Sequence, residues 1–235
     1  MGRDGIQAIF FDVGNTLLFP DKQIILEPLR ALAEEPSIEL WHAVERRTKK
    51  EFDAEMARGL ADHSFWFLFY THLLQELGIQ DDQLRNKLVN ATRISANWGH
   101  ARPGTRAILD RIGERYRIGV ISNADGKIEA LLAANGIADC FRTITDSGLV
   151  GHEKPHPAIF EAAVLAMDVA PQHCLYVGDA YSVDYAGATN AGMQAMLFDV
   201  AGAYKNDGFP RVESLQEFER QLDMAGTADP SLREG

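Results

Sequence analysis

The chain has 235 residues, of which 46% are hydrophobic and 24% charged, as in an ordinary globular protein with one large domain or a domain carrying an insert. Its 23 Lys and Arg residues against 34 Asp and Glu residues give a formal net charge of −11, which repels nucleic acid and anionic lipid, so we expect neither as a partner. No segment approaches about 18 uninterrupted apolar residues, and Cys140 and Cys174 form no CxxC pair, so we expect a cytoplasmic protein with reduced thiols.

The first predicted strand, IQAIFF (residues 6–11), runs directly into Asp12. Short runs rich in Ile and Phe, without polar alternation, are typical of parallel strands covered on both faces. Gly14, Asn15 and Thr16 follow, so the turn after this strand carries a carboxylate, an amide and a hydroxyl.

Residues 20–98 contain no convincing strand and indicate a small helical domain inserted after the first strand. Ser37, Asp62 and Asp81 are candidate N-caps, and Gly59 and Gly78 are candidate helix stops. The predicted helices are QIILEPLRALAEE (23–35), SIELWHAVERRTKKEFDAEMARG (37–59), DHSFWFLFYTHLLQELG (62–78) and DDQLRNKLVNATRISANWG (81–99).

Two features of this insert bear on function. The stretch SFWFLFYTHLL places Phe65, Trp66, Phe69 and Leu73 at helical spacing, which favours packing between the inserted helices over an aromatic wall of a substrate pocket. Two further aromatic residues, Phe19 and Trp98, flank the insert and are candidates for the rim of a pocket.

The chain after the insert alternates strands with helices, which predicts an α/β fold with a parallel sheet. The predicted strands are YRIGVIS (116–122), RTITD (142–146), HCLYVGD (173–179) and QAMLFD (194–199). The predicted helices begin at Pro103, Gly126, His156 and Val183. We therefore expect a core of residues 1–19 and 99–224, the helical insert 20–98, and a flexible tail 225–235.

Polar residues gather at the ends of the predicted strands. Ligands of open parallel sheets bind beyond the carboxyl ends of the strands, so these residues are expected at one edge. They are Asp12 after the first strand, Ser122 and Asn123 at the end of the second, Asp179 and then Asp184 after the fourth, and Lys154 ahead of the preceding helix.

This set of groups indicates phosphoryl transfer through an aspartyl-phosphate. It supplies a carboxylate nucleophile, a hydroxyl, an ammonium and two acidic metal ligands. Converging aspartates repel one another unless a divalent cation lies between them, and Mg²⁺ prefers such oxygen ligands. Asp184 could instead cap the following helix.

The ordered motifs resemble those of the haloacid dehalogenase superfamily. DVGNT (12–16) is similar to its first motif, ISN (121–123) to its second, KPHPAIF (154–160) to its third and VGDAYSVD (177–184) to its fourth. The resemblance covers the chain except the tail. It implies a Rossmann-like core with an all-helical cap that closes over the site, and a small phosphorylated metabolite as substrate.

The resemblance also implies a role for each site residue. Asp12 would attack phosphorus and bind the metal, and Lys154 would neutralise charge on the transferring group. Thr16, Ser122 and Asn123 would bind the phosphate. The remaining metal ligands would be the backbone carbonyl of Gly14 and the side chains of Asp179 and Asp184.

One position departs from the family pattern. The typical phosphatase has a second aspartate two residues after the nucleophile, and this chain has Gly14 there. A glycine keeps a backbone carbonyl for the metal but removes the general acid and base, whose loss costs about 10²- to 10⁴-fold in rate. Candidates to replace it are His63, His72, His152 and His156.

Gly14 leaves other functions open. The alternatives are a 2-haloacid dehalogenase, a phosphonatase-like hydrolase, and a weakly active regulatory or binding protein. A dehalogenase needs no Mg²⁺. A phosphonatase needs a cap lysine with a lowered pKa to form an imine, but Lys49 and Lys50 are predicted to lie on a solvated helix face. The oligomeric state also stays open.

Overall fold

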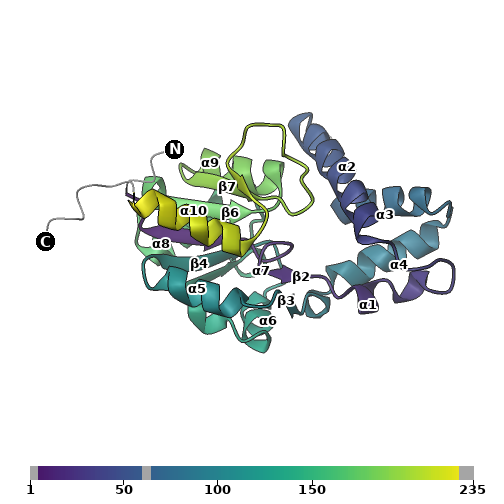
Figure 1. Ribbon diagram of the computed structural model, residues 1–235, viewed down its shortest axis with the longest axis horizontal. Coiled ribbons are helices and arrows are strands. Elements are labelled where there is room, and N and C mark those ends of the chain that lie inside the picture. Colours follow the sequence, from purple (N-terminus) through teal and green to yellow (C-terminus); the bar gives the residue numbers. More distant parts are fainter. Residues whose placement is uncertain (1–4, 60–64, 228–235) are drawn as a thin grey trace, which may run out of the picture.

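A six-stranded parallel sheet forms the core of the computed structural model, which describes residues 5–59 and 65–227 (Figure 1). The strand order is β5-β4-β1-β6-β7-β8. The strands are β1 (Ala8–Phe11), β4 (Arg117–Ser122), β5 (Thr143–Asp146), β6 (Cys174–Gly178), β7 (Gln194–Phe198) and β8 (Arg211–Val212).

Strand β1 is buried along its whole length because it lies between β4 and β6 and is covered on both faces. Ile9 and Phe11 pack into one hydrophobic cluster, and Ala8 and Phe10 into another on the opposite face. This alternation follows from the two-residue repeat of a strand. Because both faces are covered, β1 contains no polar residue.

Helices cover both faces of the sheet, which confirms the predicted α/β fold. Residues of α5, α6 and α10 join the first cluster, and residues of α8 and α9 join the second. The helices of the core are α5 (Thr105–Gly113), α6 (Ile128–Ala134), α7 (Ser147–Val150), α8 (Pro157–Met167), α9 (Ala186–Asn190) and α10 (Leu215–Thr227). Shorter helical turns are formed by Ala138–Cys140, Pro171–His173 and the π-helical turn η5 (Tyr181–Tyr185).

A second, helical layer lies beside the core in Figure 1, and we call residues 21–97 the helical module. Its helices are α1 (Lys22–Ile25), α2 (Ile38–Ala57), α3 (Phe65–Glu76) and α4 (Asp82–Arg93), with short 3-10 helices at Glu27–Leu29 and Ser95–Asn97. The chain enters and leaves the module through a two-stranded antiparallel pair, β2 (Leu18–Phe19) and β3 (His100–Ala101).

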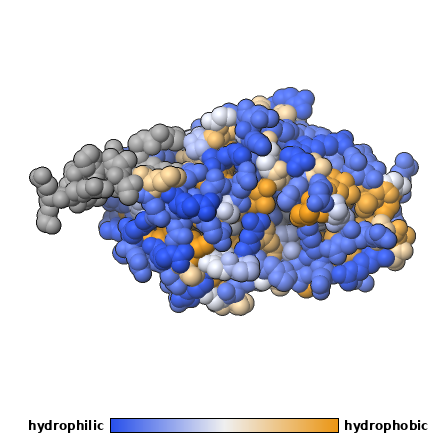
Figure 2. Space-filling model, in the orientation of Figure 1, coloured by the Kyte–Doolittle hydropathy of each residue, from blue (hydrophilic) through white to orange (hydrophobic). Residues whose placement is uncertain are grey.

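The helical module has a hydrophobic cluster of its own. Trp41, Phe69 and Leu73 are buried within it, and Phe65 and Trp66 pack against it. This confirms that the aromatic stretch of α3 contributes mainly to packing. On the face drawn in Figure 2 hydrophilic residues predominate, with hydrophobic patches over the module.

Some expected elements differ from those observed. The predicted helix 23–35 is wrong: it is broken into α1 and a 3-10 turn, because Pro28 removes a backbone donor and clashes with the preceding turn. Helix α10 had no counterpart among the predicted elements. It runs to Thr227, so the first residues of the predicted tail are helical. Residues 228–235 lie outside the described part of the chain.

Other local predictions are confirmed. The side chains of Ser37 and Asp81 accept hydrogen bonds from the backbone N–H groups of Leu40 and Leu84. Asp62 lies outside the described residues. Cys140 and Cys174 are both free thiols. None of the helices in the described ranges combines the length and the apolar character needed to cross a bilayer.

The N-cap of α4 gives a test of the local structure. Asp81→Ala removes the 2.9 Å bond to Leu84 N and should lower the free energy of unfolding by about 1 kcal/mol in urea denaturation. Gln83→Ala, an exposed change in the same turn, is the control and should be neutral. Equal effects of the two changes would contradict the capping role.

Candidate active site

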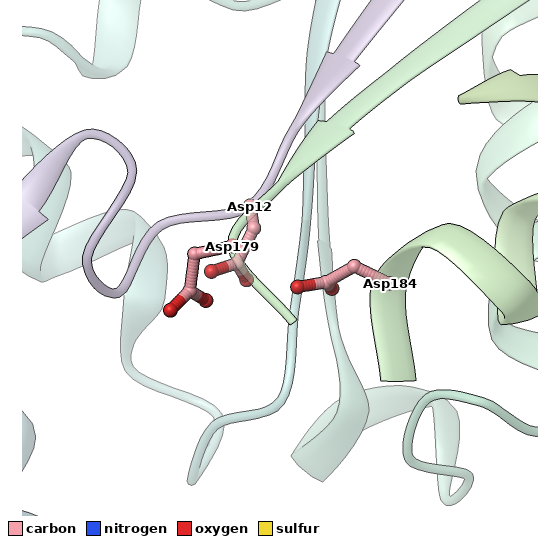
Figure 3. A group of neighbouring side chains, drawn as sticks. All are labelled: Asp12, Asp179 and Asp184. Atoms are coloured by element: carbon pink, nitrogen blue, oxygen red, sulfur yellow. The ribbon is translucent and has the colours of Figure 1, made fainter. Parts of the chain in front are cut away.

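The sheet brings the sequence-predicted carboxylates to one edge. Asp12 follows β1 and Asp179 follows β6, and these two strands are direct neighbours. Asp184 lies in η5, one turn after β6. Figure 3 shows the three side chains with their carboxylates close together at this edge. The site therefore lies at the carboxyl ends of the central strands, where the strand order reverses direction.

The three carboxylates form a group that could hold a metal ion. One oxygen each of Asp12, Asp179 and Asp184 lies within 4.8 Å of the others. Asp12 and Asp184 are 7% and 2% exposed, so water screens them little. Three oxygen ligands of negative charge suit a hard divalent cation such as Mg²⁺, and the donor set therefore fits the implied metal.

Lys154 joins these residues through all three of its ammonium N–H donors. Its Nζ lies 2.6 Å from Asp12 Oδ1, 2.7 Å from Asp184 Oδ1 and 2.8 Å from the hydroxyl of Tyr176. It is buried, and therefore is not a solvated surface lysine. The side chain of Asn123 bonds both backbone groups of Lys154, at 2.7 and 3.1 Å. Asn123 thus positions Lys154.

Tyr176 was not among the predicted site residues. Its hydroxyl accepts from Lys154 and lies 3.0 Å from Asp184 Oδ1 and 3.2 Å from the carbonyl oxygen of Ile121. A buried tyrosine hydroxyl needs a polar partner. That requirement is the signal by which Tyr176, in the middle of a buried strand, could have been found.

Burial raises the pKa of two of the site carboxylates, Asp12 and Asp179. The pKa of Asp12 rises to about 7, and the largest cause is burial, which penalises the charged form. The positive charge of Lys154 lowers this pKa, whereas the negative charges of Asp184 and Asp179 raise it. Burial likewise raises the pKa of Asp179 against the opposing charge of Lys49. For Lys154, burial opposes the charge, but Asp12 and Asp184 outweigh it and raise the pKa. A divalent cation would relieve the repulsion among these carboxylates.

The turn after β1 holds the predicted phosphate-binding threonine. Thr16 is 1% exposed, and its hydroxyl has no hydrogen-bond partner among the described residues. Asn15 adopts a left-handed conformation, φ 54°, and its side-chain amide lies 3.4 Å from Asp179 Oδ2. Ser122, at the end of β4, is also buried. An unpartnered buried hydroxyl is unusual and is suited to a ligand oxygen.

Trp98 packs beside Gly14. A Cβ added to Gly14 would lie 3.3 Å from Cζ3 of Trp98, and the indole N–H of Trp98 donates to the carbonyl of Thr92 at 2.7 Å. The space next to the position of the missing aspartate is therefore bordered by an indole ring anchored to the helical module.

The histidines are placed differently from one another. Both ring nitrogens of His72 are engaged within the helical module, with Thr48 at 3.1 Å and Glu51 at 3.0 Å. His152 and His156 stack on each other at 4.2 Å and are exposed. His63 lies outside the described residues. The engaged nitrogens of His72 leave it without a free group for acid–base chemistry.

The prediction that Lys49 is solvated is wrong. Its side chain is 2% exposed and its Nζ lies 3.0 Å from both Asp179 Oδ2 and Glu45 Oε1. Lys50 remains about half exposed, pairs with Asp207 and lies over the ring of Tyr204. The charged run of α2 appears solvated in sequence because its burial depends on contact with a distant part of the chain.

Helix α2 supplies that contact by docking one face on the loops at the sheet edge, beside the loop before α10 in Figure 1. Arg46 donates to the carbonyl of Ala201 at 2.9 Å. Asp53 accepts from the backbone N–H of Ser182 at 3.0 Å and from the hydroxyl of Tyr204 at 2.8 Å. Ser182 lies between Asp179 and Asp184 in the sequence. The helical module therefore bonds directly to the segment that carries these two carboxylates.

Comparisons with known proteins all point to one family of hydrolases. The model of the haloacid dehalogenase-like hydrolases matches residues 6–192. Haloacid dehalogenase-like hydrolase domain-containing protein 3 of Bos taurus is 29% identical over 152 residues, covering 63% of this chain and 59% of the relative, so the match spans about three fifths of that protein.

Two further proteins are similar over more of their length. Glyceraldehyde 3-phosphate phosphatase of Pyrococcus abyssi is 32% identical over 205 residues, covering 82% of this chain and 81% of the relative. The crystal structure of the putative HAD-hydrolase YfnB of Bacillus subtilis, described as bound to magnesium, matches with a TM-score of 0.64 and 19% identity over 93% of this chain and 99% of that one. At that identity the structural match supports the fold alone.

The raised pKa of Asp12 predicts a pH-dependent stability. Because the folded-state pKa of about 7 exceeds the ordinary 3.8, charging Asp12 costs folding free energy. This cost is absent at low pH, grows as pH rises from about 4 and is complete above about 7, where it is at most about 4 kcal/mol. In metal chelator, Asp12→Asn should therefore raise the melting temperature more at pH 8 than at pH 5.

Thermal denaturation at both pH values checks this prediction, with the exposed Glu34→Gln as control, which should show no such difference. A stabilisation by Asp12→Asn that is the same at both pH values would contradict it.

Proposed function

We propose that this chain, which belongs to the haloacid dehalogenase-like hydrolases, is a Mg²⁺-dependent phosphatase that acts on a small phosphorylated molecule through a phosphorylated Asp12. The observation that carries the proposal is the convergence of Asp12, Asp179 and Asp184 within 4.8 Å, joined to a buried Lys154. The phosphatase name of the Pyrococcus abyssi relative supports the choice of a phosphate ester.

In the proposed reaction, a carboxylate oxygen of Asp12 attacks phosphorus, and the bond from phosphorus to the leaving-group oxygen breaks. Water then attacks the phosphorus of the aspartyl-phosphate, which releases inorganic phosphate and restores the carboxylate. Lys154 balances negative charge, while the hydroxyls of Thr16 and Ser122 donate to phosphoryl oxygens. The bound Mg²⁺ would supply further charge neutralisation on the phosphoryl group.

The residues proposed to hold the metal are Asp12, Asp179, Asp184 and the backbone carbonyl of Gly14. The helical module would serve as the cap that excludes water and selects the substrate, because α2 contacts the loop that carries two of these ligands. We propose no nucleic acid or membrane partner, in line with the net charge of −11.

The buried lysine of the helical module also bears on the phosphonatase alternative. Lys49 lies at the site, as an imine-forming lysine would. Burial alone would lower its pKa, but Asp179 and Glu45 outweigh burial and raise the pKa well above the ordinary value. An amine must be neutral to attack a carbonyl, so this environment favours a charge-balancing role and hence the phosphatase.

An aryl phosphate assay tests the proposed function. With Mg²⁺ the wild type should release the phenol and lose this activity in metal chelator, and Asp12→Asn should lower turnover by about 10³-fold or more. Asp81→Asn, which keeps the N-cap of α4, is the matched control and should retain activity. Equal inactivity of wild type and Asp12→Asn, without metal binding by either, would instead support a regulatory or binding protein.

Gly14 and Trp98 give a second prediction. Asp at position 14 alone is crowded by Trp98, 3.3 Å from the added Cβ, so Gly14→Asp should gain little. The double variant Gly14→Asp/Trp98→Ala should raise turnover of an alkyl phosphate by about tenfold or more over Trp98→Ala, because a general acid then protonates the poor leaving group. The ratio of alkyl to aryl phosphate turnover measures this, and an unchanged ratio would show that another residue already transfers that proton.

A further inference from the structure

The site contains two buried ammonium groups with different freedom to bind a substrate. Lys154 uses its three N–H donors within the protein, on Asp12, Asp184 and Tyr176. An ammonium has no further donor. Lys154 can therefore bond a phosphoryl oxygen only by giving up one of these contacts.

Lys49 is in the opposite situation. Its Nζ lies 3.0 Å from both Asp179 Oδ2 and Glu45 Oε1, so these two contacts engage at most two of its three N–H donors. No further hydrogen-bond partner is found for it among the described residues. With 2% of its side chain exposed, water cannot readily supply the missing bonds. An unmet donor on a buried charge is costly, which points to a ligand that satisfies it.

The position of Lys49 places these donors next to the reacting groups. Its ion-pair partner Asp179 is one of the three aspartates that each place a carboxylate oxygen within 4.8 Å of the others. Contacts on either side along α2 hold the lysine there, since Arg46 and Asp53 bond Ala201, Ser182 and Tyr204 of the core.

We propose that Lys49 is a substrate-binding residue contributed by the helical module, and that its ammonium donates to an oxygen of the phosphoryl group while it remains paired with Asp179. This assignment rests on the proposed phosphatase function and goes beyond it, because none of the four sequence motifs contains Lys49.

The charges at the site support this assignment. The three site carboxylates and Glu45 carry four negative charges, which the two ammonium groups together with one divalent cation would balance. A phosphoryl dianion then adds charge that needs donors, and Lys49 is the buried lysine with donors to give. The alternative is that Lys49 only neutralises Asp179 and Glu45, in which case it would affect the metal rather than the anion.

Calorimetric titration of inorganic phosphate at saturating Mg²⁺ separates these roles. Lys49→Gln should weaken phosphate binding by about tenfold or more, the scale of a lost charge-assisted hydrogen bond. The control Lys50→Gln changes the adjacent lysine, which contacts Asp207 and Tyr204, and should leave the affinity unchanged. Titration of Mg²⁺ alone is the second readout and should show unchanged or tighter binding in Lys49→Gln.

Lys49→Gln leaves the buried Glu45 without its ion-pair partner. A second comparison, of Glu45→Gln/Lys49→Gln with Glu45→Gln, removes this effect, and the same loss of phosphate affinity is expected. Two results would overturn the role of Lys49 but leave the proposed function standing. One is a phosphate affinity that changes by less than about twofold in both comparisons, and the other is a loss of Mg²⁺ affinity as large as the loss of phosphate affinity. If the wild type bound neither Mg²⁺ nor phosphate, both the proposed function and the role of Lys49 would be overturned.

Discussion

The contact on which the site depends is the ammonium of Lys154 held between Asp12 and Asp184. These two carboxylates come from different strand ends, and both are buried, so their mutual repulsion would separate them without a positive charge between them. Lys154 is placed there by the bonds of Asn123 to its backbone and by the hydroxyl of Tyr176. The arrangement keeps a potential nucleophile close to its charge-balancing partner.

The second constraint is the docking of α2 on the sheet edge. The chain enters and leaves the helical module through the short strands β2 and β3, so the module could move relative to the core if α2 made no other contact. Here Asp53 bonds the loop between Asp179 and Asp184, and Lys49 pairs with Asp179. The helical module is therefore in direct contact with the residues that carry the site carboxylates.

Gly14 and Trp98 show how a missing functional group changes a site. Removing a carboxylate two residues after Asp12 removes both an acid and a negative charge, and the indole of Trp98 borders the space beside Gly14. The site is thereby less polar on that side, while the positive charge of Lys49 lies on the side of Asp179. In the proposed reaction, such a site would depend more on charge neutralisation of the transferring group than on proton transfer to the leaving group.

The sequence alone was sufficient for the α/β fold and for the set of residues at the strand ends, because strand periodicity and parallel pairing bring carboxyl-terminal residues such as Asp12 and Asp179 to one edge. It was not sufficient for Lys49, Tyr176 or Trp98. A lysine within a charged helical run has the same local pattern whether it is solvated or buried, and only the packing of α2 on loops more than a hundred residues away decides which. Tertiary structure therefore determined which ammonium groups reach the carboxylates and what borders Gly14.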